Sequence, residues 1–329
     1  MRDSRYLSFR DMESLRGLSF VPRRPVRGTY AGQHPSRQQG QSVEFNDYRV
    51  YMPGDEVGDI DWKVFGRSDK LFVRRREHQT DLTAHLLIDA SASMAYAGVR
   101  VNSRKRMGAR WFRRRSMELA RPLSSEMSAA TKILSKYDYA CQLAAATAFL
   151  MLEQRNRVDL AFAKDGLYRL TESRGQLQRL LNQMESIEPN GRAGLPEAIQ
   201  RMNRSSRNRG LLIIYTDLHE ACENTISAVS AWIHAGGEAT VFHILHPDEL
   251  KLPSIRQAVL IDSETEERVR LSVSEIRNSY QRAMESMCAR WKRLLNRCGA
   301  DYCRVTTDAV YHQAIRDYLT SRPTGETRH

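Results

Sequence analysis

Short apolar runs that alternate with helix-like segments constrain the fold of this chain more than any other feature. Each run has the length of one strand, and each intervening segment repeats apolar residues at helical spacing. Strands that alternate with helices predict an α/β fold, with a mostly parallel sheet and helices on both faces. The expected strands cover 85–88, 158–162, 167–170, 211–215, 239–245 and 302–306, and the expected helices cover 137–154, 174–186, 195–203, 223–234, 273–297 and 309–320.

Further segments flank this α/β domain, which we expect to span 81–321. Residues 1–42 are basic and end in a stretch rich in Gly and Gln, so they predict a partly flexible N-terminal segment. Residues 43–80 contain short apolar runs broken by turn signals, which predict a small β-rich lead-in. A hairpin is expected within 259–271, and 322–329 is assigned to a tail.

The positive charge of the chain is concentrated in two segments. The 51 basic and 39 acidic residues give a net charge of +12. Residues 1–27 contribute +4 of this charge, and residues 97–121, within an insertion at about 97–134, contribute the other +8. Basic segments attract polyanions and anionic lipid surfaces, so nucleic-acid or membrane-surface binding is an alternative function. Nucleic acid is the less favoured partner, because no nucleic-acid-binding motif accompanies the charge.

Composition argues against several classes of protein. A hydrophobic content of 41% argues against a wholly disordered chain. The longest apolar stretch, 143–152, is shorter than the roughly 20 residues that span a bilayer, so no transmembrane segment is expected, although peripheral membrane contact stays open. Five cysteines without a CxxC pair favour reduced thiols and a cytoplasmic location.

Two of the expected strands end in a carboxylate, since Asp89 follows the first strand and Asp217 follows the fourth. In an open parallel sheet, ligands bind outside the carboxyl ends of the strands, where the strand order reverses. Ser91 and Ser93 follow Asp89 at alternate positions, and hydroxyl and carboxylate oxygens suit a hard cation such as Mg²⁺. The alternative is structural: the serines cap the next helix, and Asp89 accepts hydrogen bonds from backbone amides.

Two motifs carry a family resemblance. The run HLLIDASASM at 85–94 resembles the metal-ion-dependent adhesion site of a von Willebrand factor A domain. The run YRVYMPGDEVGDIDWKVFGRSDKLFVRRRE at 48–77 resembles the signature of domain-of-unknown-function family 58 (DUF-58). The resemblance extends from about residue 40 to residue 321 and implies a von Willebrand A-like, Rossmann-like fold. The signature includes a turn and a tryptophan that we expect to be structural, with matching residues Pro53, Gly54, Asp55, Asp61 and Trp62.

The resemblance also implies a function. Members of this family resemble non-enzymatic binding modules that work beside MoxR-type AAA+ ATPases in the assembly or maturation of protein complexes. In related adhesion sites two serines contact the metal and the aspartates hold it partly through water, a pattern that assigns Ser91 and Ser93 as inner ligands and Asp89 and Asp217 as mostly outer ones. An acidic side chain of a partner then completes the shell. Ala193 stands where the site normally has a threonine, so one direct ligand is missing.

The basic insertion follows the Asp-x-Ser-x-Ser motif, so we expect it to project near the metal-binding edge of the sheet. We predict that it contributes to partner recognition and favours acidic protein surfaces. The candidate partner-binding residues are Arg104, Lys105, Arg106, Arg113, Arg114 and Arg115. Catalysis is not expected, because the sequence contains no nucleophile elbow, zinc-protease helix or phosphate-binding loop.

Overall fold

The computed structural model describes eleven stretches of the chain. The linker-like residues 28–42, the signature residues 53–62 and the basic residues 104–115 lie outside them. The described stretches are 4–20, 45–50, 72–76, 82–98, 134–164, 167–173, 177–206, 210–219, 222–252, 257–261 and 268–322.

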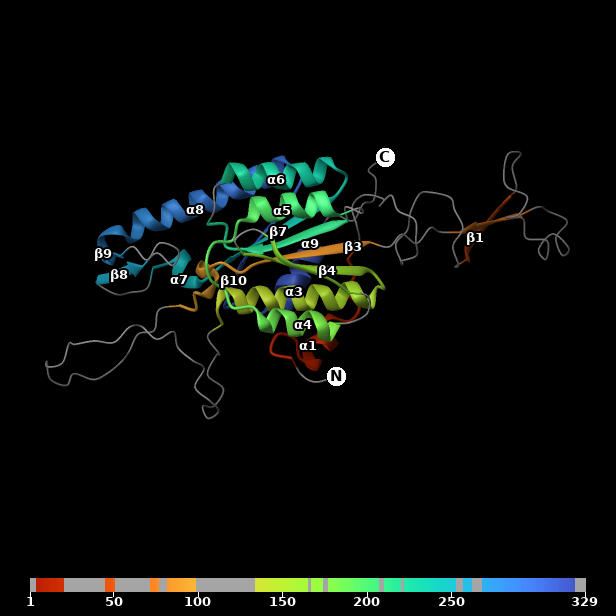
Figure 1. Ribbon diagram of the computed structural model, residues 1–329, viewed down its shortest axis with the longest axis horizontal. Coiled ribbons are helices and arrows are strands. Elements are labelled where there is room, and N and C mark those ends of the chain that lie inside the picture. The colour runs from red at the N-terminus through yellow and green to blue at the C-terminus, as the bar shows by residue number, and fades with distance from the viewer. Residues whose placement is uncertain are drawn as a thin grey trace.

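A six-stranded sheet forms the centre of the domain, in the order β10-β7-β6-β3-β4-β5 (Figure 1). All neighbouring pairs are parallel except β4 and β5, which makes β5 an antiparallel edge strand. The strand order reverses between β3 and β6, so the crossover point of the sheet lies between these two strands. The strands are β3 (Thr83–Asp89), β4 (Arg157–Ala163), β5 (Leu167–Ser173), β6 (Leu211–Thr216), β7 (Glu238–Leu245) and β10 (Asp301–Thr306).

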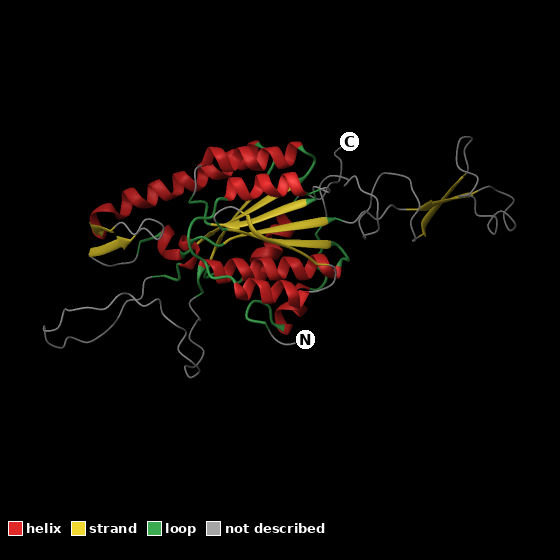
Figure 2. Cartoon of the chain, viewed as in Figure 1, coloured by secondary structure: helices red, strands yellow, loops and turns green. Residues whose placement is uncertain are grey.

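Helices cover both faces of the sheet (Figure 2). Successive residues of a strand point to opposite faces, so Leu86 and Ile88 of β3 join one apolar cluster while Leu87 joins the other. The predicted α/β fold is therefore confirmed. The first cluster includes α3 (Lys136–Glu153), α4 (Leu177–Ser186) and α9 (Tyr311–Ser321), and the second includes α5 (Leu195–Ser205), α6 (Cys222–His234) and α8 (Val273–Arg297).

Smaller elements complete the described chain. Strands β1 (Phe45–Val50) and β2 (Phe72–Arg76) pair antiparallel within the segment expected to be β-rich. Strands β8 (Gln257–Ile261) and β9 (Arg268–Ser272) form the expected hairpin. The 3₁₀ helix η2 (Ala92–Ala95) follows β3, and the single-turn helix α7 (Pro247–Leu250) follows β7 at the carboxyl end of the sheet (Figure 1).

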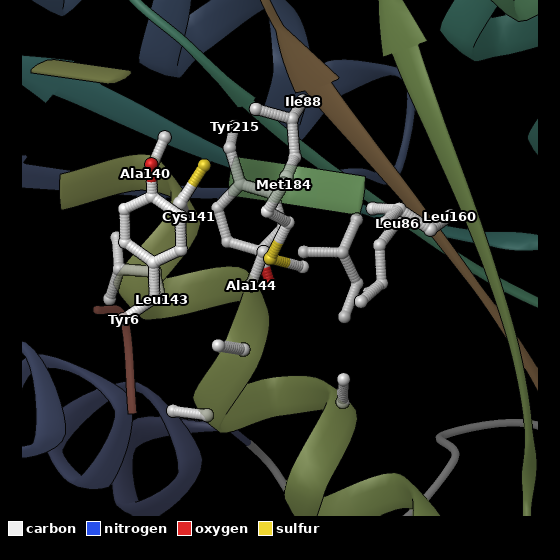
Figure 3. Close-up of a cluster of buried hydrophobic side chains, with 14 of the residues drawn as sticks. Tyr6, Leu86, Ile88, Ala140, Cys141, Leu143, Ala144, Leu160, Met184 and Tyr215 are labelled. Atoms are coloured by element: carbon white, nitrogen blue, oxygen red, sulfur yellow. The ribbon is translucent and has the colours of Figure 1, made fainter. Parts of the chain in front are cut away.

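Part of the segment predicted as a basic, partly flexible N-terminus belongs to the core of the domain. Residues 4–20 contain helix α1 (Phe9–Leu15), whose first turn is closed by a capping box between Ser8 and Asp11. Figure 3 shows the ring of Tyr6 beside Ala140 and Cys141 of α3. The sequence analysis did not anticipate this packing, because the apolar residues of the segment are spaced among arginines. The buried ones are Tyr6, Leu7, Met12, Leu15 and Phe20.

The C-terminal end of the domain is joined to this N-terminal segment. Arg322, which the sequence analysis assigned to the tail, is buried, forms an ion pair with Glu238 and lies over the ring of Phe20. Arg316 of α9 donates a hydrogen bond to the carbonyl oxygen of Ser14, at 2.9 Å. Segments from the two ends of the described chain therefore pack together on one face of the sheet.

These contacts predict that residues 4–20 stabilise the whole domain. Leu15→Ala removes a fully buried side chain and leaves a cavity, so it should lower the free energy of unfolding by about 3 kcal/mol. Phe9→Ala, at the other end of α1, is the control: its side chain is 61% exposed, so the loss should be under about 1 kcal/mol. Urea unfolding measures both, and equal losses would contradict the packing of α1 on the core.

Candidate functional site

Asp89 and Asp217 lie at the carboxyl ends of β3 and β6, at the crossover point of the sheet. Asp89 is held by three donors: Ser91 Oγ at 2.6 Å, the Ser91 amide at 2.9 Å and Thr216 Oγ1 at 2.7 Å. Because Thr216 belongs to β6, this last hydrogen bond joins the two strands on either side of the crossover. The first aspartate is thus buried and fixed from both strands.

Ser91 and Ser93 complete the predicted group of four residues. Their hydroxyl oxygens lie 3.1 Å apart, and a hydrogen bond from Ser93 helps to lower the pKa of Asp217. Ser91 stands at the N-cap position of η2, but its side chain makes no capping bond there and donates to Asp89 instead. Asp89 also accepts a hydrogen bond from the Ser91 amide. The structural role considered for these residues is therefore observed for Asp89 but not for Ser91.

A buried lysine enters the same group. Lys136 is the first residue of α3 and only 1% exposed. Its Nζ lies 2.7 Å from Asp217 Oδ2 and 2.6 Å from Glu249 Oε1 of α7. Burial disfavours its charge, but the two carboxylates outweigh burial and raise the pKa of Lys136 above its ordinary value. A permanent ammonium therefore joins α3, the end of β6 and α7 at the carboxyl edge.

His219 extends this charged group towards the surface. Its Nε2 lies 3.6 Å from both Asp217 Oδ2 and Glu249 Oε1, and its side chain is 42% exposed. Burial opposes its charge, yet the nearby carboxylates of Glu249 and Asp217 raise the pKa of His219. Leu218, between the two partners, has a left-handed backbone with φ of 54°, which a non-glycine residue seldom adopts. This strained turn brings the side chains of both Asp217 and His219 close to Glu249 and Lys136.

The two aspartates have opposite electrostatic environments. Burial and then the charge of Asp217 raise the pKa of Asp89 to about 7. For Asp217 burial acts in the same direction, but Lys136 and then His219 outweigh it, so the pKa of Asp217 is lowered. Asp217 is therefore the carboxylate that stays ionised, and Lys136 is the reason.

The loop expected to supply a threonine lies where the family pattern places it. The amide of Ala92 donates to Gly191 O at 3.0 Å, and the amide of Asn190 donates to Ala90 O at 2.9 Å. Ala193 is buried in the second apolar cluster, and its methyl group offers no oxygen. The loop therefore contacts the Asp-x-Ser-x-Ser segment without contributing a threonine hydroxyl.

Lys136 opposes a Mg²⁺ ion in direct contact with Asp217. A divalent cation bound to Asp217 Oδ2 would lie within about 5 Å of the Lys136 ammonium, which contacts the same oxygen. Two positive charges at that separation repel each other by several kcal/mol, at roughly 7 kcal/mol for an effective dielectric constant of 20. Within the described part of the chain, no group of three or more His, Cys, Asp or Glu side chains is arranged to hold a metal ion.

The basic insertion begins and ends beside this group. Tyr96 O, before the insertion, accepts a hydrogen bond from the amide of Lys136, after it, at 3.0 Å. The Tyr96 hydroxyl donates to Asp248 of α7 at 3.3 Å, and its ring meets that of His246 edge to face. Both ends of the insertion therefore lie at the carboxyl edge, next to Asp217. The candidate partner-binding residues themselves lie outside the described residues, as do Pro53, Gly54, Asp55, Asp61 and Trp62.

Comparison with known proteins identifies the family. A family model described as protein of unknown function DUF58 matches residues 47–110 and 108–290. The chain belongs to this family. Uncharacterized proteins of Mycobacterium bovis and Mycobacterium tuberculosis are each 25% identical to it over 319 residues, which cover 95% of this chain and 90% of theirs.

Solved structures with similar folds were also found. BatB from Bacteroides thetaiotaomicron has a TM-score of 0.40 and 13% identity, covering 73% of this DUF58 chain and 100% of its own. An aerotolerance-related membrane protein from Bacteroides fragilis has a TM-score of 0.43 and 14% identity, with the same coverage. The SpRpn10 VWA domain has a TM-score of 0.39 and 12% identity, covering 75% and 98%. For the DUF58 chain itself, none of the described helices combines the length and apolarity needed to cross a membrane.

Lys136, Glu249 and His219 were missed in the sequence. A lysine in the first turn of a helix lies at the positive end of the helix dipole, where its charge is mildly disfavoured. That anomaly was the available signal for Lys136. Glu249 follows β7, the next parallel strand beyond β6, and could have been found by searching every strand end for carboxylates. His219 gives no comparable signal, because an exposed loop histidine is common.

His243 of β7 lies beneath the charged group and is fully buried. Its Nε2 lies 3.0 Å from Asp217 O, and its Nδ1 lies 2.7 Å from the Tyr302 hydroxyl. Burial lowers its pKa from 6.5 to about 4, so the folded state keeps this imidazole neutral. It therefore acts as a structural support for the backbone at Asp217.

The lowered pKa predicts acid sensitivity. As pH falls below 6.5, the unfolded chain binds a proton at His243 before the folded chain does, so stability present above pH 6.5 is lost towards pH 4. Between pH 7 and pH 5 this group should account for about 2 kcal/mol of the free energy of unfolding. His243→Gln should remove that part of the pH dependence in urea unfolding, and the exposed His234→Gln should leave it intact. A profile unchanged in His243→Gln would contradict the assignment.

Proposed function

We propose that this DUF58 protein is a non-enzymatic protein-interaction module that presents the carboxyl edge of its sheet to partner proteins. The observation that carries the proposal is the position of the basic insertion, whose two ends are hydrogen-bonded together beside the buried charges of Asp217 and Lys136 and the partly buried Glu249. A rigid edge that supports a long, highly basic segment suits recognition of an acidic surface.

A binding role is also supported by the state of the charged residues. A catalytic acid or base must reach the substrate, whereas Asp89, Asp217 and Lys136 are at least 98% buried and are paired with groups of the protein. We therefore propose that these charges maintain the shape of the edge and take no part in a reaction. The proposal includes a cytoplasmic location, which the five free cysteines favour.

The partners we propose are a MoxR-type AAA+ ATPase and an acidic client protein, as the family resemblance implies. The alternative, binding of nucleic acid or an anionic membrane, depended on both basic segments. In the first of these segments Arg5 forms an ion pair with Asp138 of α3 at 2.7 Å, and neighbouring side chains are buried in the core. Part of that segment therefore packs into the domain, so the insertion is the more available of the two basic segments.

Binding of the purified full-length chain to a purified MoxR-type ATPase of the same organism tests this proposal. In biolayer interferometry at low salt, the variant with Arg113, Arg114 and Arg115 changed to Ala should bind at least about tenfold more weakly than the unmodified chain. The matched control changes Lys292, Arg293 and Arg297 to Ala, which removes the same charge. These residues lie in the last turns of α8, which precede β10 and so lie at the opposite edge of the sheet. The control should bind normally.

Three outcomes would contradict the proposal. The ATPase could fail to bind, the two triple variants could weaken binding equally, or duplex DNA and anionic vesicles could bind as tightly as the ATPase at physiological salt. The last outcome would favour the alternative function, because it would show that the chain binds polyanions in general and does not select the ATPase.

A further inference from the structure

The positive charge at the crossover of the sheet comes from a side chain of the protein, Lys136. Three carboxylates, those of Asp89, Asp217 and Glu249, converge at the carboxyl ends of adjacent strands. Converging buried carboxylates need a positive charge nearby, since isolated buried charge is strongly unfavourable. Lys136 Nζ supplies it at 2.7 Å and 2.6 Å from two of the three.

We propose that the Lys136 ammonium replaces the divalent cation of an adhesion-type site, so that the carboxyl edge of this protein is assembled without metal. This inference does not depend on the proposed function, because it concerns how the edge is held together, whatever binds to it. It is an alternative to our sequence-based expectation of a Mg²⁺ ion at Asp89, Ser91, Ser93 and Asp217.

Two features favour replacement over an ordinary surface ion pair. The first is burial, because Lys136 is 1% exposed and Asp217 is 1% exposed, which removes the pair from solvent screening. The second is position, because Lys136 contacts the carboxylate after β6, the strand end that carries a conventional site's second aspartate. Ala193 also stands where a threonine is expected, so one direct ligand for a metal is missing.

The replacement has a structural consequence for the insertion. Lys136 is the residue whose amide closes the insertion on Tyr96 O, and its ammonium lies 5.9 Å from the centre of the Tyr96 ring. Lys136 therefore joins the two ends of the insertion through its backbone amide, and anchors them to β6 and α7 through its ammonium. A metal ion in that position could be removed by a chelator, whereas an ammonium of the chain cannot.

Thermal unfolding of the full-length chain, with and without divalent cations, tests the replacement. The unmodified protein should have the same melting temperature in EDTA, in 10 mM MgCl₂ and in 1 mM MnCl₂. Lys136→Ala should melt roughly 10 °C lower in EDTA, because it leaves buried carboxylates without a counter-charge. Mg²⁺ or Mn²⁺ should then raise its melting temperature by about 3 °C or more, because the vacated position accepts a cation.

Lys136→Arg serves as the control that retains a positive charge, and it should not respond to either metal. Calorimetric titration of Mn²⁺ into the unmodified protein supplies a readout that does not require the variant to fold. No saturable heat would support the replacement. Saturable heat that is lost in Ser91→Ala and Asp217→Ala would overturn it, and so would a folded Lys136→Ala variant whose stability is indifferent to both metals.

Discussion

The ion pair between Lys136 and Asp217 is the interaction on which the carboxyl edge of the sheet depends. It joins the first residue of α3 to the end of β6, and through Glu249 it also holds α7 after β7. Asp89 is attached to the same assembly by Thr216 and by the serines that follow β3. One buried ammonium thus holds the chain after β6 and β7 directly, and the end of β3 is attached to them through Thr216. Removing one partner of such a pair is strongly destabilising, because the other charge stays buried without compensation.

This arrangement changes how an adhesion-like edge works. A site that needs a metal and a partner carboxylate is completed from outside, whereas we propose that this site is completed from inside by the ammonium of Lys136. In this proposal the edge is assembled before any partner binds, and the most basic segment, the insertion, begins and ends at it. Recognition by long-range electrostatics gives fast, salt-sensitive association and needs no metal-bridged contact. The proposed role as an interaction module is consistent with that division between a fixed edge and a basic insertion.

Much of the fold could be predicted from the sequence, and the misses have physical causes. The run at 211–215 is apolar throughout, as a central parallel strand buried on both faces must be, and the amphipathic pattern at 273–297 gave α8 its observed bounds. Asp89, Ser91, Ser93 and Asp217 also lie close together, because parallel strands end at one edge, and their role as metal ligands stays a prediction. Residues 4–20 were assigned to a separate segment, because their charge masked the apolar spacing of Leu15 and its neighbours. The role of Lys136 depends on a contact between residues 81 positions apart, which no local pattern encodes.

A double-mutant cycle between Lys136 and Asp217 tests the central claim most directly. Urea unfolding of Lys136→Met, Asp217→Asn and the double variant gives the coupling energy of the pair, and the exposed pair of Arg290 and Glu223 provides a control cycle. We expect a coupling above about 2 kcal/mol for the buried pair and below about 1 kcal/mol for the exposed one. Additive effects of the two buried substitutions would show that the ammonium does not hold the edge together, and would contradict the account.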